Sequence, residues 1–185
     1  MRTRRAGQSA LLLLDAVAVL RSKSIEYAVI GAMAASVHGS LRASADADAL
    51  LSVTVSKLAN LFRAFKKAGF ATELRRGDAD DPIPAMLIIR DTHGNRVDLL
   101  GGLRGLDPEV FSRAVDVPFS GDTLRVVGRE DFIAMKCFAG GPQDVADARL
   151  ALKTAQAPVD HGLLRRVTRR FGRAAADVLE QILAH

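Results

Sequence analysis

In Ala45-Asp-Ala-Asp-Ala-Leu-Leu-Ser-Val-Thr54, two aspartates open an apolar run. This pattern predicts a strand that begins at or near the aspartates. Successive side chains of a strand point to opposite faces, so Asp46 and Asp48 lie on one face, about 6.6 Å apart along the chain. Two such carboxylates repel each other unless a cation neutralises them. Mg²⁺ suits this position, because it usually binds through one or two protein carboxylates together with substrate phosphates.

A third carboxylate lies in the apolar segment Arg96-Val-Asp-Leu-Leu100, which also has the composition of a strand. If this strand pairs beside the first, Asp98 joins the cluster, and three carboxylates can hold two metal ions. An Asp-x-Asp pair taken alone is more often part of a surface loop or a helix cap. The metal-site prediction therefore depends on the surrounding sequence.

Upstream of the aspartates, the run from Ile25 to Ile30 predicts a strand that ends at Gly31. The next residues, Ala32 to His38, are good helix formers. A glycine where a strand meets a helix lets backbone N–H groups approach phosphate oxygens without a Cβ in the way. Such a glycine can also be a simple turn, so it supports a phosphate site only together with the carboxylates.

Hydrophobic periodicity and turn residues divide the rest of the chain. Strands are predicted over 70–74, 86–90 and 96–100, with a hairpin turn at 91–95. Helices are predicted over 8–22, 57–68 with Ser56 as N-cap, 129–139, 143–155, 161–170 and 173–184. The predicted fold class is α+β, a mixed sheet flanked by helices and followed by a helical portion. We expect residues 1–102 to form the core and 103–185 a mainly helical lobe packed on it.

The composition of the chain restricts the compartment and the partners that are expected for it. The 185 residues are 49% hydrophobic, with a net charge of +5 and one cysteine, Cys137. No intrachain disulfide can form, so a reducing cytoplasm fits best. The basic leader before residue 6 is expected to be solvated, and the apolar run that follows it is too short to cross a membrane. The positive charge leaves room for a polyanionic partner.

The segments Ile30-Gly-Ala-Met-Ala-Ala-Ser-Val-His-Gly39 and Arg42-Ala-Ser-Ala-Asp-Ala-Asp48 resemble the DNA polymerase beta-type nucleotidyltransferase superfamily. The likeness is closest to minimal bacterial nucleotidyltransferases and abortive-infection nucleotidyltransferase toxins. It continues in Arg129-Glu-Asp-Phe-Ile-Ala-Met-Lys136, which is similar to the family's helix-borne lysine, and in Gly141-Pro-Gln-Asp-Val-Ala-Asp147. The resemblance therefore runs from about residue 26 to residue 152.

This resemblance implies a nucleotidyltransferase fold, two Mg²⁺ ions that Mn²⁺ can replace, and a nucleoside triphosphate such as ATP as donor. It implies that Asp46, Asp48 and Asp98 are the catalytic and metal-binding residues. It further implies nucleotide binding by Gly31, Ala32, Ser44, Lys136 and Asp144. Two positions depart from the family pattern, because Ala32 replaces a common Gly or Ser and Gly141 replaces a common Arg. Lys136 fits a solvated helix lysine equally well, and Asp144 can simply favour a helix N-terminus.

The acceptor is the open part of the prediction. Arg165, Arg166, Arg169, Arg170 and Arg173 form a stripe at helical spacing that could follow a phosphate backbone, although most charge runs are solvated faces. We expect an RNA acceptor, most plausibly tRNA, or a protein side chain, with a role as the toxin of a toxin–antitoxin pair and a cognate antitoxin as partner. One alternative is transfer to an aminoglycoside or lincosamide antibiotic, for which the acidic loop Asp78, Asp80 and Asp81 is a candidate. Another is a non-catalytic nucleotide-binding or partner-binding module.

Overall fold

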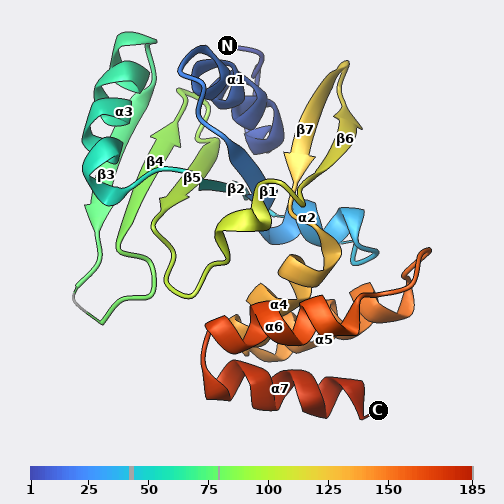
Figure 1. Cartoon of the computed structure of the whole chain (residues 1–185). Coiled ribbons are helices and arrows are strands. Elements are labelled where there is room, and N and C mark those ends of the chain that lie inside the picture. The colour runs from blue at the N-terminus through green and yellow to red at the C-terminus, as the bar shows by residue number, and fades with distance from the viewer. Residues whose placement is uncertain (42–43, 79, 185) are drawn as a thin grey trace.

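The computed structural model describes residues 1–41, 44–78 and 80–184. Within these residues the chain forms one sheet in the order β3-β4-β5-β2-β1-β7-β6 (Figure 1). The strands are β1 (Tyr27–Ile30), β2 (Asp46–Leu51), β3 (Ala71–Arg76), β4 (Ala85–Arg90), β5 (Arg96–Gly101), β6 (Val115–Phe119) and β7 (Asp122–Val126). Neighbours are antiparallel except for the pairs β2–β5 and β1–β7, so the sheet is mixed. The predicted α+β fold class is confirmed.

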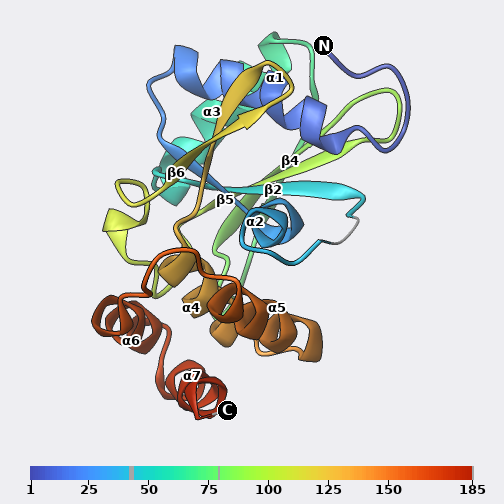
Figure 2. The ribbon, with the colours of Figure 1, turned by 90° about the vertical axis from the view of Figure 1, so that its right-hand side faces the viewer.

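Two helices cover one face of this sheet (Figure 2). Helix α1 (Ser9–Ser22) buries Leu12, Leu13, Leu14, Val17 and Leu20 against the central strands. Helix α3 (Val55–Lys67) presents Leu58, Leu61 and Phe65 at helical spacing toward the neighbouring strands. One part of the hydrophobic core therefore lies between these two helices and the sheet, and the same core continues into the C-terminal helices.

Helix α3 begins earlier than predicted. The residue that flanks its first turn is Thr54, with extended backbone angles, rather than Ser56. The Ser56 hydroxyl lies 3.0 Å from the Thr54 hydroxyl instead of capping the helix. The predicted N-cap was therefore wrong by two residues, a usual error because several neighbouring hydroxyl residues can compete for the cap.

The opposite face of the sheet carries the short helix α2 (Gly31–Val37), and below it lie the C-terminal helices (Figure 2). These helices are α4 (Arg129–Ala139), α5 (Pro142–Lys153), α6 (His161–Arg170) and α7 (Arg173–Leu183). The end of α2 packs against α4 and the residues before it. His38 lies 2.8 Å from the Val127 carbonyl, and its ring contacts the ring of Phe132. His38 is thus a packing residue.

A hairpin and a short turn of 3₁₀ helix precede α4 and were not predicted. The 3₁₀ turn η1 (Pro108–Val110) leads to β6 and β7, which join the core sheet through β1. Ser120 and Gly121 both have positive φ and form the tight turn. The sheet therefore continues past Gly102, and the division of the chain into lobes at that residue stays a prediction.

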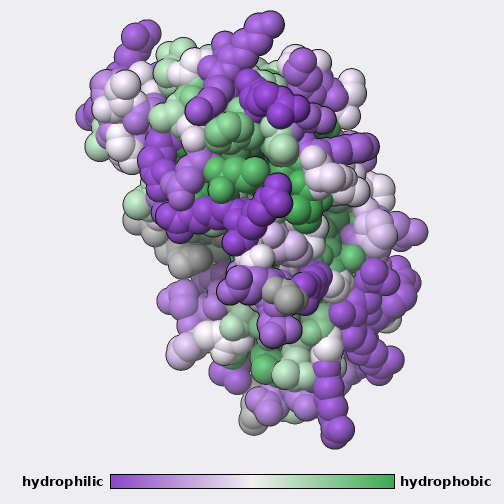
Figure 3. Space-filling model, turned by 90° about the vertical axis from the view of Figure 1, so that its left-hand side faces the viewer, coloured by the Kyte–Doolittle hydropathy of each residue, from purple (hydrophilic) through white to green (hydrophobic). Residues whose placement is uncertain are grey.

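One face of the molecule combines hydrophilic and hydrophobic residues (Figure 3). On the side of the molecule where β3 is the edge strand, hydrophobic residues form a band bordered by hydrophilic ones (Figure 3).

Among the described residues, none of the helices combines the length and the apolar character needed to cross a bilayer. Cys137 is buried, and burial raises the pKa of its thiol to about 12, so this thiol is unreactive.

Candidate active site

Two of the three predicted carboxylates are direct neighbours in the sheet. Strands β2 and β5 run parallel, with Asp48 opposite Asp98 and Asp46 opposite Arg96. Paired residues on adjacent strands point to the same face, and adjacent strands lie about 4.8 Å apart. Alternate residues of β2, Ala47 and Ala49, are buried on the side of α1. The carboxylates therefore share the other face, the one that carries α2.

Gly31 closes one side of this site. It follows directly after β1, whose last residue, Ile30, is the register partner of Asp48. Its φ of +64° is a left-handed conformation, and a Cβ at this position would overlap a carboxylate oxygen of Asp48 and lie 3.1 Å from its Cγ. Only glycine combines this backbone angle with so close an approach. The turn therefore brings the backbone of the first residue of α2 against the carboxylate.

Arg96 is a residue of the site that was not predicted from the sequence. Its guanidinium donates two hydrogen bonds of 2.7 Å to the two carboxylate oxygens of Asp98, in a side-on pair. The hydrogen bonds to Asp98 raise the pKa of Arg96 above its usual value despite partial burial, and the charges of Asp46 and Asp48 add to the shift. Arg96 therefore acts as the positive counter-charge of the carboxylate cluster.

A metal ion was predicted at this cluster. As the side chains stand in the described part of the chain, no three His, Cys, Asp or Glu residues converge closely enough to hold one. The donor set still fits Mg²⁺, because Asp48 and Asp98 are adjacent, Asp46 is on the same face and carboxylate oxygen is the ligand that Mg²⁺ prefers. An ion bound by Asp98 would compete with the Arg96 guanidinium for the same carboxylate.

A small cavity of about 110 Å³ lies beside the cluster and joins three predicted site residues. Asp46, Ser44 and Ala32 line it, together with Ser36, Met33 and the start of α1. The Ser44 hydroxyl accepts a 3.3 Å hydrogen bond from the backbone N–H of Asp46. Pockets for whole ligands are typically about 300–1,000 Å³, so this one fits a phosphate-sized part of a substrate.

Lys136 and Asp144 come together in a separate cluster between α4 and α5. The ammonium of Lys136 lies 2.7 Å from Asp144 and 2.9 Å from Asp147, and only 8% of the residue is exposed. Asp147 is fully buried and also accepts hydrogen bonds from Ser40 at 2.7 Å and from Gln143 at 3.0 Å. Burial by itself would raise the pKa of Asp147, but these hydrogen bonds and Lys136 outweigh it and lower the pKa.

These contacts exclude the solvated-lysine interpretation of Lys136. They give Lys136 a structural partner in Asp147, the last residue of a segment that carries the family resemblance, and they tie α5 to the segment that follows α2 through Ser40. Contact of Lys136 or Asp144 with a nucleotide stays a prediction. Arg42, which contributes to the family resemblance, lies outside the described residues.

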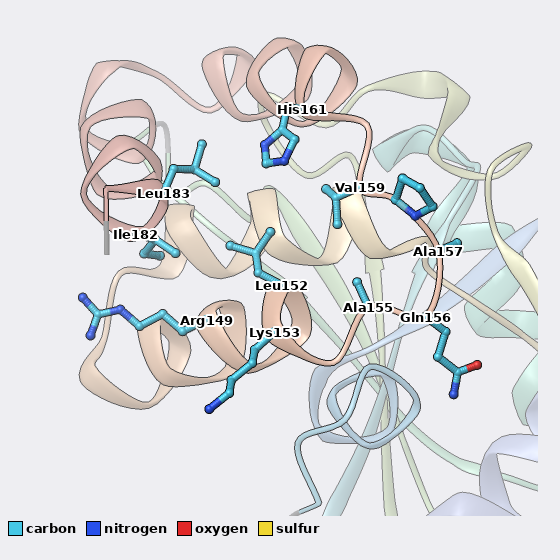
Figure 4. Close-up of a pocket in the computed structure, with 11 residues that line it drawn as sticks. Arg149, Leu152, Lys153, Ala155, Gln156, Ala157, Val159, His161, Ile182 and Leu183 are labelled. Carbon is cyan, nitrogen blue, oxygen red and sulfur yellow. The ribbon is translucent and has the colours of Figure 1, made fainter.

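A larger cavity lies in the helical layer, apart from the carboxylates (Figure 4). It measures about 920 Å³, and Leu152, Val159, Ile182 and Leu183 form its apolar lining. Arg149 and Lys153 extend at its edge, and the ring of His161 points toward the interior (Figure 4). Its described lining contains no carboxylate, so we do not place the metal-dependent chemistry there.

Comparison with known proteins supports the fold through structure rather than sequence. No family model matches the chain, and no curated protein matches it. Among solved structures, an antigenic nucleotidyltransferase-like protein from Paracoccidioides brasiliensis has a TM-score of 0.55 at 16% identity, over 98% of this chain and 95% of that one. The structure of ANT(2″)-Ia in complex with adenylyl-2″-tobramycin has a TM-score of 0.60 at 13% identity, over 87% and 95%.

A third similar structure is the lincomycin-bound lincosamide antibiotic adenylyltransferase LnuA, with a TM-score of 0.51 at 12% identity, over 83% of this chain and 100% of that one. The match spans nearly the whole length of each of these proteins. The mixed sheet and its helices therefore form a nucleotidyltransferase-like fold.

Proposed function

We propose that the protein is a Mg²⁺-dependent nucleotidyltransferase that moves a nucleoside monophosphate from a triphosphate, such as ATP, to a hydroxyl acceptor. One observation carries the proposal: Asp48 and Asp98 are register partners on adjacent strands, and Gly31 has no side chain where its backbone meets Asp48. This arrangement combines carboxylates for a cation with backbone close enough to meet phosphate oxygens.

In the proposed reaction, the acceptor oxygen attacks the α-phosphorus, the bond from that phosphorus to the pyrophosphate oxygen breaks, and pyrophosphate leaves. Asp46, Asp48 and Asp98 would hold Mg²⁺, which when bound neutralises the triphosphate and lowers the pKa of the acceptor hydroxyl. Asp98 accepts the hydroxyl proton on a carboxylate oxygen after it releases Arg96. The backbone N–H groups of Gly31 and Ala32 would bind the terminal phosphates, and Ser44 lines the adjacent cavity together with Ala32.

For the acceptor we propose RNA, with tRNA as the first substrate to test and a protein side chain as the next. The net charge of +5 is compatible with a polyanionic acceptor. Arg96 and its register partner on β4, Arg90, are both paired with carboxylates, those of Asp98 and Glu73, so they do not select the acceptor. A toxin role with a cognate antitoxin belongs to the same proposal.

Transfer to an antibiotic is the second candidate, and it is supported by the likeness to ANT(2″)-Ia and LnuA. The acidic loop suggested for that substrate makes hydrogen bonds within itself. The backbone N–H of Asp81 donates to the Asp78 carbonyl, and the Asp81 carboxylate accepts from the N–H of Ile83 at 2.7 Å. Transfer of label from a triphosphate to tobramycin or lincomycin, in place of RNA, would favour this candidate.

The test uses α-³²P-labelled nucleoside triphosphates, Mg²⁺ or Mn²⁺, and total RNA and protein as acceptors. Wild-type protein is expected to label an acceptor, and the variant Asp46→Asn, Asp48→Asn is expected to label none. Asp116→Asn is a matched control, because it removes an exposed carboxylate on β6 and leaves the cluster intact. Failure of the wild type to label any acceptor, despite metal-dependent triphosphate binding, would support the non-catalytic binding module instead.

A further inference from the structure

The residues before α1 form a fixed strap beside the carboxylate cluster. We define the N-terminal strap as residues 2–8. The buried side chain of Asn95 binds the strap at two points. The Asn95 amide donates to the Arg5 carbonyl at 2.9 Å, and the Asn95 side-chain oxygen accepts from the Gln8 N–H at 2.6 Å. The same amide donates to Asp91 at 2.7 Å, so the strap is joined to the β4–β5 hairpin.

Ser9, the first residue of α1 and the next residue after the strap, contacts the residue before β2 and the first residue of β5. The Ser9 hydroxyl donates to the Ala45 carbonyl and accepts a 3.0 Å hydrogen bond from the backbone N–H of Arg96. Gly7 and Ser9 also line the small cavity that contains Asp46 and Ser44. The strap therefore contributes Gly7 to the wall of this cavity. Of the basic leader that was expected to be solvated, Arg2, Arg4 and Arg5 are exposed and Thr3 is buried.

The arginines of the strap have different roles. Arg2 is an anchor, because its guanidinium lies 3.1 Å from Asp122 and 3.6 Å from Asp15. Arg4 and Arg5 have fixed backbones, since their N–H groups donate to the Gln8 side chain at 2.6 and 3.2 Å. Their side chains are exposed and, among the described residues, make no ion pair. Two guanidinium groups with no ion pair to a described residue therefore project from a strap whose Gly7 lines the cavity that contains Asp46.

We propose that Arg4 and Arg5 bind backbone phosphates of the RNA acceptor and place its reactive hydroxyl beside the carboxylates. This inference rests on the proposed function. An acidic cluster repels a polyanion, so an RNA acceptor needs nearby cations to approach it. The strap provides them at low entropic cost, because its backbone is already ordered.

The arginine stripe on α6 is a weaker candidate for this role. Arg165 makes a paired interaction with Glu180 at 2.7 and 3.1 Å, and Arg170 donates to the Leu106 carbonyl at 3.2 Å. Arg173 lies 3.9 Å from Asp177. In both ribbon views α6 and α7 lie at the opposite end of the molecule from the N-terminus (Figures 1 and 2). The stripe and the strap therefore lie toward opposite ends of the molecule.

The test compares two variants that each remove two positive charges: Arg4→Gln, Arg5→Gln in the strap and Arg166→Gln, Arg169→Gln on α6. Binding of a fluorescein-labelled tRNA transcript is followed by anisotropy at several salt concentrations. The strap variant is expected to bind about tenfold more weakly and to lose about 1.5 to 2 from the slope of log affinity against log salt. The α6 variant should bind within about twofold of wild type.

Arg4→Lys, Arg5→Lys is a conservative variant that should keep most of the binding, and its melting temperature reports whether the strap still folds. Mg²⁺-dependent binding of a fluorescent ATP analogue is measured in parallel and should not change in the strap variant. Equal losses in the strap and α6 variants, or no loss in the strap variant, would overturn the inference. Weaker ATP-analogue binding with intact tRNA binding would overturn it too, by assigning the arginines to the donor. Because tRNA binding is measured without turnover, its outcome is independent of whether nucleotide transfer occurs.

Discussion

Arg96 and Asp98, two residues apart on β5, form a side-on ion pair with both hydrogen bonds at 2.7 Å, on the face that also carries Asp46 and Asp48. The guanidinium occupies a coordination position that the proposed metal chemistry needs. Binding of a divalent cation by Asp98 therefore competes with an internal cation that is already in place.

Replacement of Arg96 by Gln is expected to tighten Mn²⁺ binding about tenfold, equivalent to about 1.4 kcal/mol, because it removes both the competing hydrogen bonds and a positive charge. Isothermal titration or Mn²⁺ electron paramagnetic resonance measures this directly. Arg75→Gln is the control, since Arg75 is an exposed β3 arginine that pairs with Glu73 instead. Unchanged Mn²⁺ affinity in Arg96→Gln would remove Asp98 from the ligand set.

Gly31→Ala should lower nucleotide transfer by about 100-fold or more, because the new Cβ displaces Asp48 and a small displacement at a reacting site has an effect of this size. A positive φ alone costs a side chain about 1–2 kcal/mol of folding free energy. Gly69→Ala separates the two effects, because Gly69 has a φ of +88° and no atom within 4 Å of an added Cβ. If the two variants lose equal stability and neither loses activity, the close contact with Asp48 has no catalytic role.

Lys136→Met is expected to lower the free energy of unfolding by about 3–5 kcal/mol, since it leaves the carboxylate of Asp147 buried without its cation. The double variant Lys136→Met, Asp147→Asn should recover a large part of that loss. Urea unfolding of both proteins gives the comparison. A stable Lys136→Met protein with a raised KM for the triphosphate would show instead that Lys136 serves the nucleotide.

Stability should fall as the pH drops below about 6.5 because of His38. Burial lowers the pKa of His38 below its ordinary value of 6.5, against the opposing effect of the Val127 carbonyl. The folded protein therefore binds the proton less readily than the unfolded chain, and protonation favours unfolding. Unfolding by urea at pH 7.5 and 5.5 should show this loss in the wild type and a smaller one in His38→Gln, which keeps an N–H donor. An equal loss in both proteins would assign the pH dependence to other groups.

The sequence predicted the elements whose signals are local. The alternation around Asp46 and Asp48 and the apolar segment around Asp98 each predicted a strand and the face of its aspartates. The sequence did not show that these two strands are adjacent. Periodicity describes a single strand, and the partner strand is distant in the chain. The role of Arg96 depends on the same strand geometry: it lies two residues before Asp98, on the same face.

Other features were missed for identifiable reasons. The β6–β7 hairpin had a signal in the alternating Val115, Val117 and Phe119 before Ser120 and Gly121, but its strands are short and are interrupted by Pro118. The N-terminal strap has neither periodicity nor turn signature. Its order comes from Asn95, a buried amide whose hydrogen-bond partners are remote in sequence, and only the folded structure reveals such partners.

The parallel pairing of β2 with β5 has a consequence for the order in which this protein is made. The chain between these strands includes α3, β3 and β4, so Asp48 and Asp98 meet only after that whole segment has been synthesised and the long loop has closed. Pairing of distant strands is the slow part of folding. A nascent chain on the ribosome therefore carries Asp46, Asp48 and the glycine turn without their third carboxylate, and the completed cluster first exists once β5 has emerged.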